Sequence, residues 1–168
     1  EETRRRAAFT VLESLKAFTP KRRDAIIENL QERLDVITLQ SEPLMLTWQD
    51  ILIMAAKGIS FGAHTKSHPI LSTLNDSELY EEIVGSKKVL EQRLNAPITT
   101  FAYPNGRSGD YDHRVVSLLQ QTGFDCAVTT MPGLNELNQN VYELLRLAPW
   151  EKNPYRLYGR LVTHSLFN

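Results

Sequence analysis

Hydrophobic residues in the first part of the chain recur at the spacing of amphipathic helices. Apolar side chains return every three or four positions over residues 5–18 and again over residues 23–34, which is the period of one helix face. Pro20 should end the first stretch, because proline has no N–H to donate inside a helix. The pattern predicts two helices, followed by a connection over residues 35–46. We expect this segment to pack or to shape a surface, and we assign no chemistry to it.

From residue 47 onward, short apolar runs alternate with longer amphipathic stretches, which predicts alternating strands and helices. The expected elements are, in chain order, helix 47–57, strand 59–63, helix 75–94, strand 98–102, helix 111–122, strand 124–128, strand 142–147 and a helix that begins at Asn153. Such alternation is typical of a parallel sheet with helical crossovers. Right-handed crossovers would bring the loops 62–69, 103–110 and 129–133 to one edge of that sheet.

The helix expected over residues 75–94 has leucine and isoleucine side chains along one face and charges on the other. Glu81, Glu82, Lys87 and Lys88 are among the charged positions. We interpret these four side chains as a solvated face, which is the usual role of charges on an amphipathic helix.

Composition limits the class of protein. The 168 residues suit one domain with its own core, and a net charge of −1 does not indicate a nucleic-acid partner or an anionic membrane. No apolar stretch is long enough for a transmembrane span. Cys126 is the only cysteine, so an internal disulfide is impossible, and its apolar neighbours predict a core position. Because the chain begins with Glu1 rather than Met, we expect a piece of a longer protein, and the cell envelope, periplasm and cytoplasm all stay open.

Candidate chemistry begins with two histidines on the loop that follows the expected strand 59–63. His64 and His68 are four positions apart, and Pro69 disfavours helical backbone angles at His68. Loops at strand ends are where α/β folds place their active sites, and neutral imidazole is a common zinc ligand. On spacing alone, a solvated or hydrogen-bonded pair is the more frequent interpretation of two such histidines.

Three stretches resemble the polysaccharide deacetylases (carbohydrate esterase family 4). His-Thr-Lys-Ser-His-Pro at 64–69 resembles the metal-binding motif of that family, and Phe-Ala-Tyr-Pro-Asn-Gly at 101–106 is similar to its third motif. Residues 126–133 resemble a later strand and loop of one bacterial branch. The similarity runs over 47–147, and that branch tolerates a helical insertion before the histidine motif, which fits residues 5–46.

The resemblance implies an α/β fold: an incomplete, irregular (β/α) barrel of the polysaccharide deacetylase type with an N-terminal helical insertion. The chain would be a single catalytic-domain fragment, in which residues 1–46 form the insertion or packing segment and residues 47–168 the deacetylase core. The implied activity is metal-dependent hydrolysis of N-acetyl groups from an N-acetylated polysaccharide or oligosaccharide, with release of acetate. Which glycan is the substrate stays open.

The resemblance also implies roles for individual residues. His64 and His68 would bind Zn²⁺ or another divalent transition metal, and the backbone N–H of Asn105 would help to hold the oxyanion. Thr65 and Ser67 would orient the ring nitrogens, and Tyr103 would pack either against a sugar ring or against the fold. The residues expected beside the substrate or behind these groups are Thr65, Ser67, Tyr103, Pro104, Gly106 and Arg146.

Parts of the family pattern are missing. The first motif, a strand that ends in two aspartates, supplies the third metal ligand and the catalytic base, and no Asp-Asp pair occurs in this sequence. We expect that motif upstream of Glu1. An arginine that often precedes the third-motif proline is replaced by Ala102. The general-acid histidine has only one candidate, His164, which is offset by one position in a context that looks helical, and His113 is interpreted as a surface residue.

Two other functions stay open from the sequence. A degenerate deacetylase fold could serve as a non-catalytic carbohydrate-binding or scaffold domain. Another metal hydrolase could also carry a similar histidine loop. The missing aspartates are the sequence feature that separates an enzyme from a binding domain.

Overall fold

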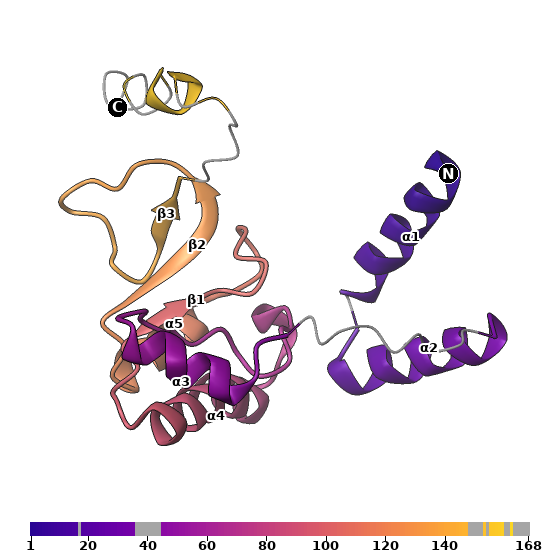
Figure 1. The fold of residues 1–168 in the computed structure, drawn as a ribbon, viewed down its shortest axis with the longest axis horizontal. Helices are drawn as coiled ribbons and strands as arrows, with labels where there is room; N and C mark the ends of the chain where they lie inside the picture. Colours follow the sequence, from indigo (N-terminus) through magenta and orange to yellow (C-terminus); the bar gives the residue numbers. More distant parts are fainter. Residues whose placement is uncertain (17, 36–44, 148–152, 154, 160–161, 163–168) are drawn as a thin grey trace.

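The computed structural model of this protein describes residues 1–16, 18–35, 45–147, 153, 155–159 and 162. Helices α1 (Glu2–Leu15) and α2 (Pro20–Arg33) form an arm beside the rest of the chain (Figure 1). The two helices predicted in this segment are confirmed, and both begin earlier than the expected 5–18 and 23–34. Pro20 is the first residue of α2, where its missing N–H costs nothing.

The remaining elements are α3 (Trp48–Ala56), the 3₁₀ turn η1 (Leu71–Thr73), α4 (Asp76–Leu94), β1 (Thr100–Ala102), α5 (His113–Gln121), β2 (Cys126–Pro132) and β3 (Leu144–Arg146). The three strands form one parallel sheet in the order β1-β2-β3. The expected α/β architecture with parallel pairing is confirmed, and in the described part of the chain this sheet is open.

Side-chain caps fix where the helices begin. Thr47 and Asp50 form a reciprocal capping box at the start of α3, and Asn75 and Glu78 form another at the start of α4. The carboxylate of Asp112 accepts two backbone N–H groups at the start of α5. These polar residues fix the boundaries locally, which is why the helix starts could be predicted within one or two positions.

The prediction of a strand over residues 59–63 is wrong. Only Ala63 pairs with the sheet, by a parallel bridge to Phe101, with its N–H 2.9 Å from Thr100 O. The Ile59 N–H instead donates to Met54 O at 3.1 Å in the turn that ends α3. The first residues of this apolar run therefore belong to a helix terminus, and only the last one reaches the sheet.

Strand β2 continues through most of the segment expected to be its exit loop. The expected loop covered residues 129–133, but β2 extends to Pro132, which pairs with Arg146 after a register shift that begins at Val128. The Thr129 hydroxyl donates to Leu144 O at 3.0 Å and holds the irregular part of the pairing. Half-buried Cys126 begins this strand at the margin of the core.

The core lies between the sheet and helices α4 and α5. Phe101 is at its centre, with ring centroids 5.4 Å from Tyr103 and 5.5 Å from Phe124. Tyr103 is almost fully buried, its ring stacks on Tyr111 at 4.0 Å, and its hydroxyl donates to Tyr142 O at 2.7 Å. Of the two roles considered for Tyr103, the structure shows packing against the fold.

Lys87 of α4 is not part of a solvated face. Its ammonium donates to Ile98 O at 2.7 Å and to Gly123 O at 2.8 Å, and the side chain is only 12% exposed. Both carbonyls lie just before a strand of the sheet, so Lys87 connects α4 to the starts of β1 and β2. The sequence could not reveal this role, because neither carbonyl is near Lys87 in the sequence.

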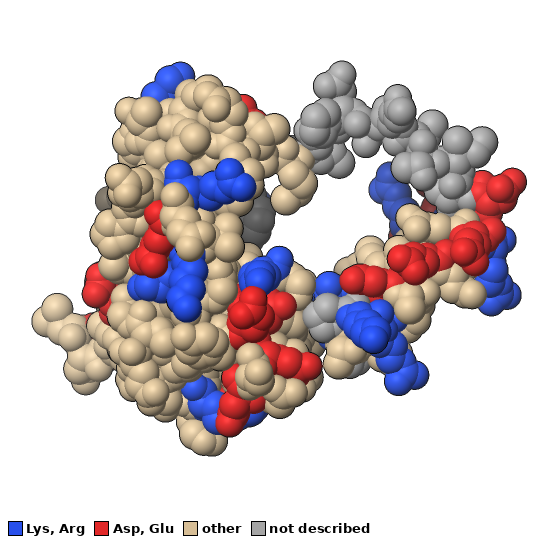
Figure 2. Space-filling view, turned by 90° about the horizontal axis from the view of Figure 1, so that it is seen from below, with Lys and Arg blue, Asp and Glu red and all other residues tan. Residues whose placement is uncertain are grey.

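Acidic and basic side chains lie interspersed on the face of the molecule shown in Figure 2, over the helical arm as well as the core. Across the described residues, none of the helices combines the length and the apolar character that crossing a bilayer would require.

We predict that Lys87→Met lowers the free energy of unfolding by about 1–3 kcal/mol, because two carbonyls would lose a charged donor in a largely buried place. Lys88→Met, at the exposed neighbouring position, is the matched control and should change it by less than about 0.5 kcal/mol. Urea denaturation followed by circular dichroism measures both. Equal effects of the two substitutions would contradict the bridging role of Lys87.

Candidate active site

The two histidine rings meet edge to face beside the end of β1. Their centroids are 4.8 Å apart with an interplanar angle of 78°. His64 Nδ1 lies 2.7 Å from Ala102 O, and since a carbonyl only accepts, this nitrogen carries the proton and leaves Nε2 free. Two imidazoles that share a tetrahedral zinc ion at about 2.1 Å would have centroids about 5 Å apart. The ring geometry therefore fits a shared metal ion.

The backbone of the histidine loop takes a shape that few residues adopt without support. Thr65 and His68 both have positive φ, at 65° and 57°, in the left-handed region that costs side chains energy. His68 therefore avoids right-handed helical angles, as Pro69 predicts. It adopts left-handed angles instead. The Thr65 hydroxyl accepts the His68 N–H at 3.1 Å, which closes the loop on itself. Thr65 thus acts on the backbone of the loop, not on a ring nitrogen.

Glu82 of α4 holds the middle of this loop. Its carboxylate accepts Lys66 N at 2.7 Å, Ser67 N at 2.9 Å and the Ser67 hydroxyl at 2.6 Å. Ser67 therefore binds Glu82, whereas the ring contact on His64 comes from Ala102 O. The solvated role expected for Glu82 is wrong. The sequence carried no signal for this contact, because Glu82 looks like any charge on the outer face of a helix.

The helical arm also reaches this loop. Arg23 of α2 donates from Nη2 to Ser67 O at 3.1 Å. Burial lowers the pKa of His68, and the neighbouring His64 and the cationic Arg23 and Lys16 lower it further. At neutral pH, His68 is therefore held as the neutral imidazole, the form that binds metal ions.

The turn after β1 places a backbone donor close to the histidine loop. Asn105 and Gly106 have positive φ, at 59° and 67°, and Gly106 N donates to Pro104 O at 2.6 Å. A Cβ at Gly106 would lie 2.8 Å from Thr130 N, so only glycine fits there. No acceptor among the described residues takes the Asn105 N–H, which leaves it available to a ligand.

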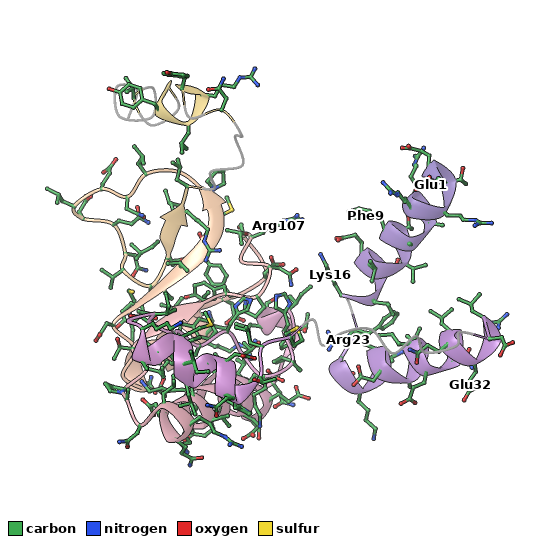
Figure 3. All side chains as sticks on the ribbon, in the orientation of Figure 1. Glu1, Phe9, Lys16, Arg23, Glu32 and Arg107 are labelled. Atoms are coloured by element: carbon green, nitrogen blue, oxygen red, sulfur yellow. The ribbon has the colours of Figure 1, made fainter. Side chains whose placement is uncertain are left out.

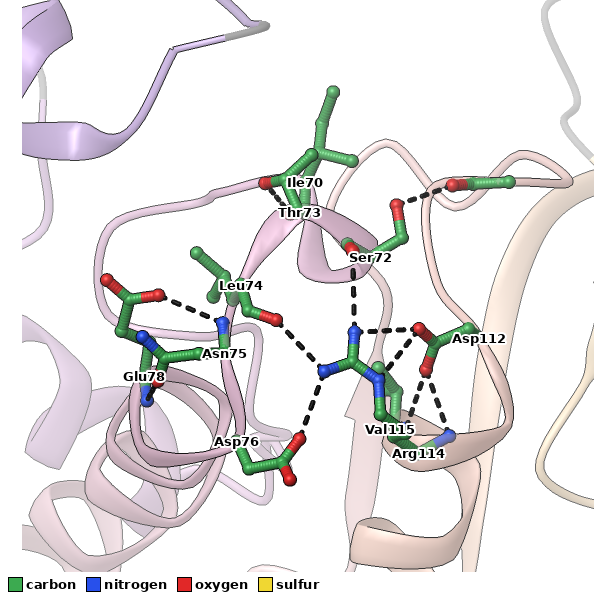
Figure 4. Close-up of polar contacts among 11 residues, drawn as sticks. Ile70, Ser72, Thr73, Leu74, Asn75, Asp76, Glu78, Asp112, Arg114 and Val115 are labelled. Carbon is green, nitrogen blue, oxygen red and sulfur yellow. Dashed lines mark hydrogen bonds and ion pairs between the residues drawn. The ribbon is translucent and has the colours of Figure 1, made fainter.

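Arg114 of α5 joins the segments that follow the two motifs (Figure 4). Its guanidinium donates to Leu74 O at 3.1 Å, to Asp76 at 3.0 Å and to Asp112 at 2.8 Å. Burial alone would raise the pKa of Asp112, but its bonds to Arg114 and to backbone N–H groups hold the pKa below its ordinary value. Ser72 adds a bond from its hydroxyl to Gly109 O at 2.6 Å. These contacts hold the exits of both loops together.

A pocket of about 370 Å³ opens between helix α1 and the histidine loop. Its lining includes Phe9, Leu12 and Glu13 from α1, Lys16 at the C-cap of α1, and His68 and Asn105 from the two motif loops. His64 lines a different pocket, of about 400 Å³, beside Trp48 and Val89. The helical segment to which we assigned no chemistry therefore forms one wall of the candidate site.

Several predicted residues lie away from this pair of loops or cannot be placed. Arg146 is the exposed last residue of β3, and its side chain has no partner within the described part of the chain. Tyr103 lies in the core. His164 falls outside the described residues. Within the described ranges, no group of three or more His, Cys, Asp or Glu side chains is placed to hold a metal ion. The candidate ligands in this part of the protein are the two histidines.

Comparison with known proteins agrees with the family resemblance. Residues 10–127 match the family model described as polysaccharide deacetylase. A Bacillus subtilis (strain 168) protein named for the same family, YxkH, is 32% identical over 102 residues, which are 61% of this chain and 36% of YxkH. Chitin deacetylase 1 of Cryptococcus neoformans var. grubii is 34% identical over 73 residues, 44% of this chain and 15% of that protein.

The fold agrees as well. The solved structure of the Streptococcus pyogenes deacetylase PplD in complex with acetate superposes with a TM-score of 0.65 at 26% identity, covering 73% of this chain and 53% of PplD. The chain thus spans about a third to a half of these bacterial relatives. Because the family model covers more than half of the chain and includes both motif loops, this protein belongs to the polysaccharide deacetylase family.

Proposed function

We propose that this chain is part of an enzyme that removes N-acetyl groups from an N-acetylated polysaccharide or oligosaccharide and releases acetate. The observation that carries the proposal is the pair of histidine rings 4.8 Å apart, next to a turn whose Asn105 N–H is unpaired within the described residues. Chitin deacetylase 1 and the acetate-bound PplD support the same chemistry by their names.

In this proposal, His64 Nε2 and a nitrogen of His68 hold Zn²⁺ or another divalent transition metal. When bound, such an ion supplies Lewis-acid polarisation and lowers the pKa of water. The Asn105 N–H donates to the oxyanion that forms when the acetamido carbonyl is attacked. We propose that the third ligand and the base are aspartates of the family's first motif, outside residues 1–168.

A non-catalytic carbohydrate-binding domain is the second candidate. It is favoured by the absence of a third ligand next to the histidines in the described ranges. The two candidates differ in acetate release. The full-length protein that contains this chain should release acetate from N-acetylated oligosaccharides if it is an enzyme, and glycan binding without acetate would favour the binding domain.

We expect Zn²⁺ binding by the 168-residue chain to depend on both histidines. His64→Ala and His68→Ala should each weaken binding at least about tenfold, because each removes half of the available nitrogen ligands. His113→Ala, at an exposed position on α5, is the control and should leave the affinity unchanged. Isothermal titration calorimetry measures all four proteins. An unchanged affinity in both loop variants would show that the metal assignment is wrong.

Glu82→Ala should also weaken Zn²⁺ binding, by about 10-fold or more, although Glu82 need not touch the ion. The substitution removes three hydrogen bonds that hold the positive-φ loop. Glu81→Ala, which removes an exposed contact with Lys66, is the matched control and should bind zinc like the original chain. The same calorimetric titration tests this, and equal affinities for the two variants would contradict the supporting role of Glu82.

A further inference from the structure

We propose that helix α1 forms a sugar-binding subsite of the candidate active site. In this subsite the ring next to the reacting residue of an N-acetylated glycan would lie on Phe9 and Leu12. The inference rests on the proposed function for its substrate class. It adds a ligand contact in the helical segment 2–33, whose sequence shows no motif.

The first observation is continuity. The pocket of about 370 Å³ is lined both by α1 and by His68 and Asn105, the groups that would act on the acetamido carbonyl. Its volume falls within the roughly 300–1,000 Å³ of ordinary ligand sites. A glycan with one residue at the histidine loop therefore has its neighbouring residue beside α1.

The second observation is the chemistry of the wall. Phe9 and Leu12 are 64% and 60% exposed, although both are large and apolar. They are three positions apart and so share one face of the helix. A flat aromatic ring beside an aliphatic side chain suits the C–H face of a pyranose, which needs apolar contact area and little hydrogen bonding. Exposed apolar surface in a pocket is typical of a binding site.

Polar groups for the sugar hydroxyls lie at the C-terminal end of α1 and at its C-cap residue. Glu13 and Lys16 both line the pocket and pair with each other at 2.7 Å, with side chains 41% and 42% exposed. An exposed pair of this kind is worth little by itself, so either group can turn to a hydroxyl. Figure 3 shows Phe9 and Lys16 on the side of α1 that faces the core, and Arg107 extending from the loop after β1 toward α1.

The arm is anchored where this role requires it. Arg23 of α2, which also lines the pocket, donates to Ser67 O in the middle of the histidine loop. The wall of the pocket is thereby connected to the loop that carries His68. Oligomers should consequently bind better than a single sugar, because only an oligomer reaches both the loop and α1.

The test compares the affinities of the 168-residue chain for N-acetylglucosamine and for its β-1,4- and β-1,6-linked tetramers. Binding is followed by NMR amide shifts, in a buffer that contains a metal chelator. At least one tetramer should bind about tenfold tighter than the monomer. Phe9→Ala should reduce that advantage about fivefold, and Phe9→Trp should keep it. Val11→Ala is the matched control, since Val11 is 43% exposed on the same helix and does not line the pocket.

Two results would overturn the inference: no length preference with either tetramer, or an advantage that Phe9→Ala and Val11→Ala leave equally intact. Failure of the proposed function looks different. In that case the full-length protein would release no acetate from N-acetylated oligosaccharides, while the preference for a tetramer and its dependence on Phe9 would remain. If the full-length protein releases acetate and Phe9→Ala does not reduce that release, the deacetylase proposal stands and the α1 subsite is rejected.

Discussion

The backbone pairing of Ala63 with β1 determines where the candidate site lies. Two hydrogen bonds of 2.9 Å, from Ala63 N to Thr100 O and from Ala102 N to Ala63 O, tie the last residue before the histidine loop to the strand that ends at the Pro-Asn-Gly turn. A Cβ at Gly62 would lie 2.5 Å from the Thr100 hydroxyl and 3.0 Å from the Thr100 backbone oxygen, so any side chain here would force Thr100 to shift. The same pairing leaves Ala102 O free to hold the His64 ring.

Loops with positive φ angles need support from outside, and here that support comes from charged side chains far away in the sequence. Glu82 reaches back from α4 to the histidine loop, and Arg114 joins the exits of both motif loops. Each of these charges is matched by several hydrogen bonds, as charges taken out of water must be. Helix α4 is therefore both a crossover between strands and part of the framework of the site.

The helical arm contributes one wall of the candidate site. The sequence of residues 2–33 predicts two amphipathic helices with exposed charges. It does not specify which surface their apolar faces contact. In the structure Phe9 and Leu12 stay exposed in a pocket that also contains His68 and Asn105. An apolar surface kept open next to two candidate reactive groups is more useful for a ligand than for stability.

The sequence by itself determined the features that depend on neighbouring residues. Amphipathic periodicity predicted the helices over 47–57 and 75–94, whose starts are fixed by local caps at Thr47 and Asn75. Helix–strand alternation predicted the parallel sheet, and Pro69 predicted that His68 avoids right-handed helical angles. Only the tertiary structure decided that Ala63 pairs with β1 and that Glu82 and Lys87 are bound to backbone. The physical reason is distance along the chain: a cap bonds three residues away, whereas the partners of Glu82 and Lys87 lie 11 to 36 residues away, beyond the reach of any local pattern.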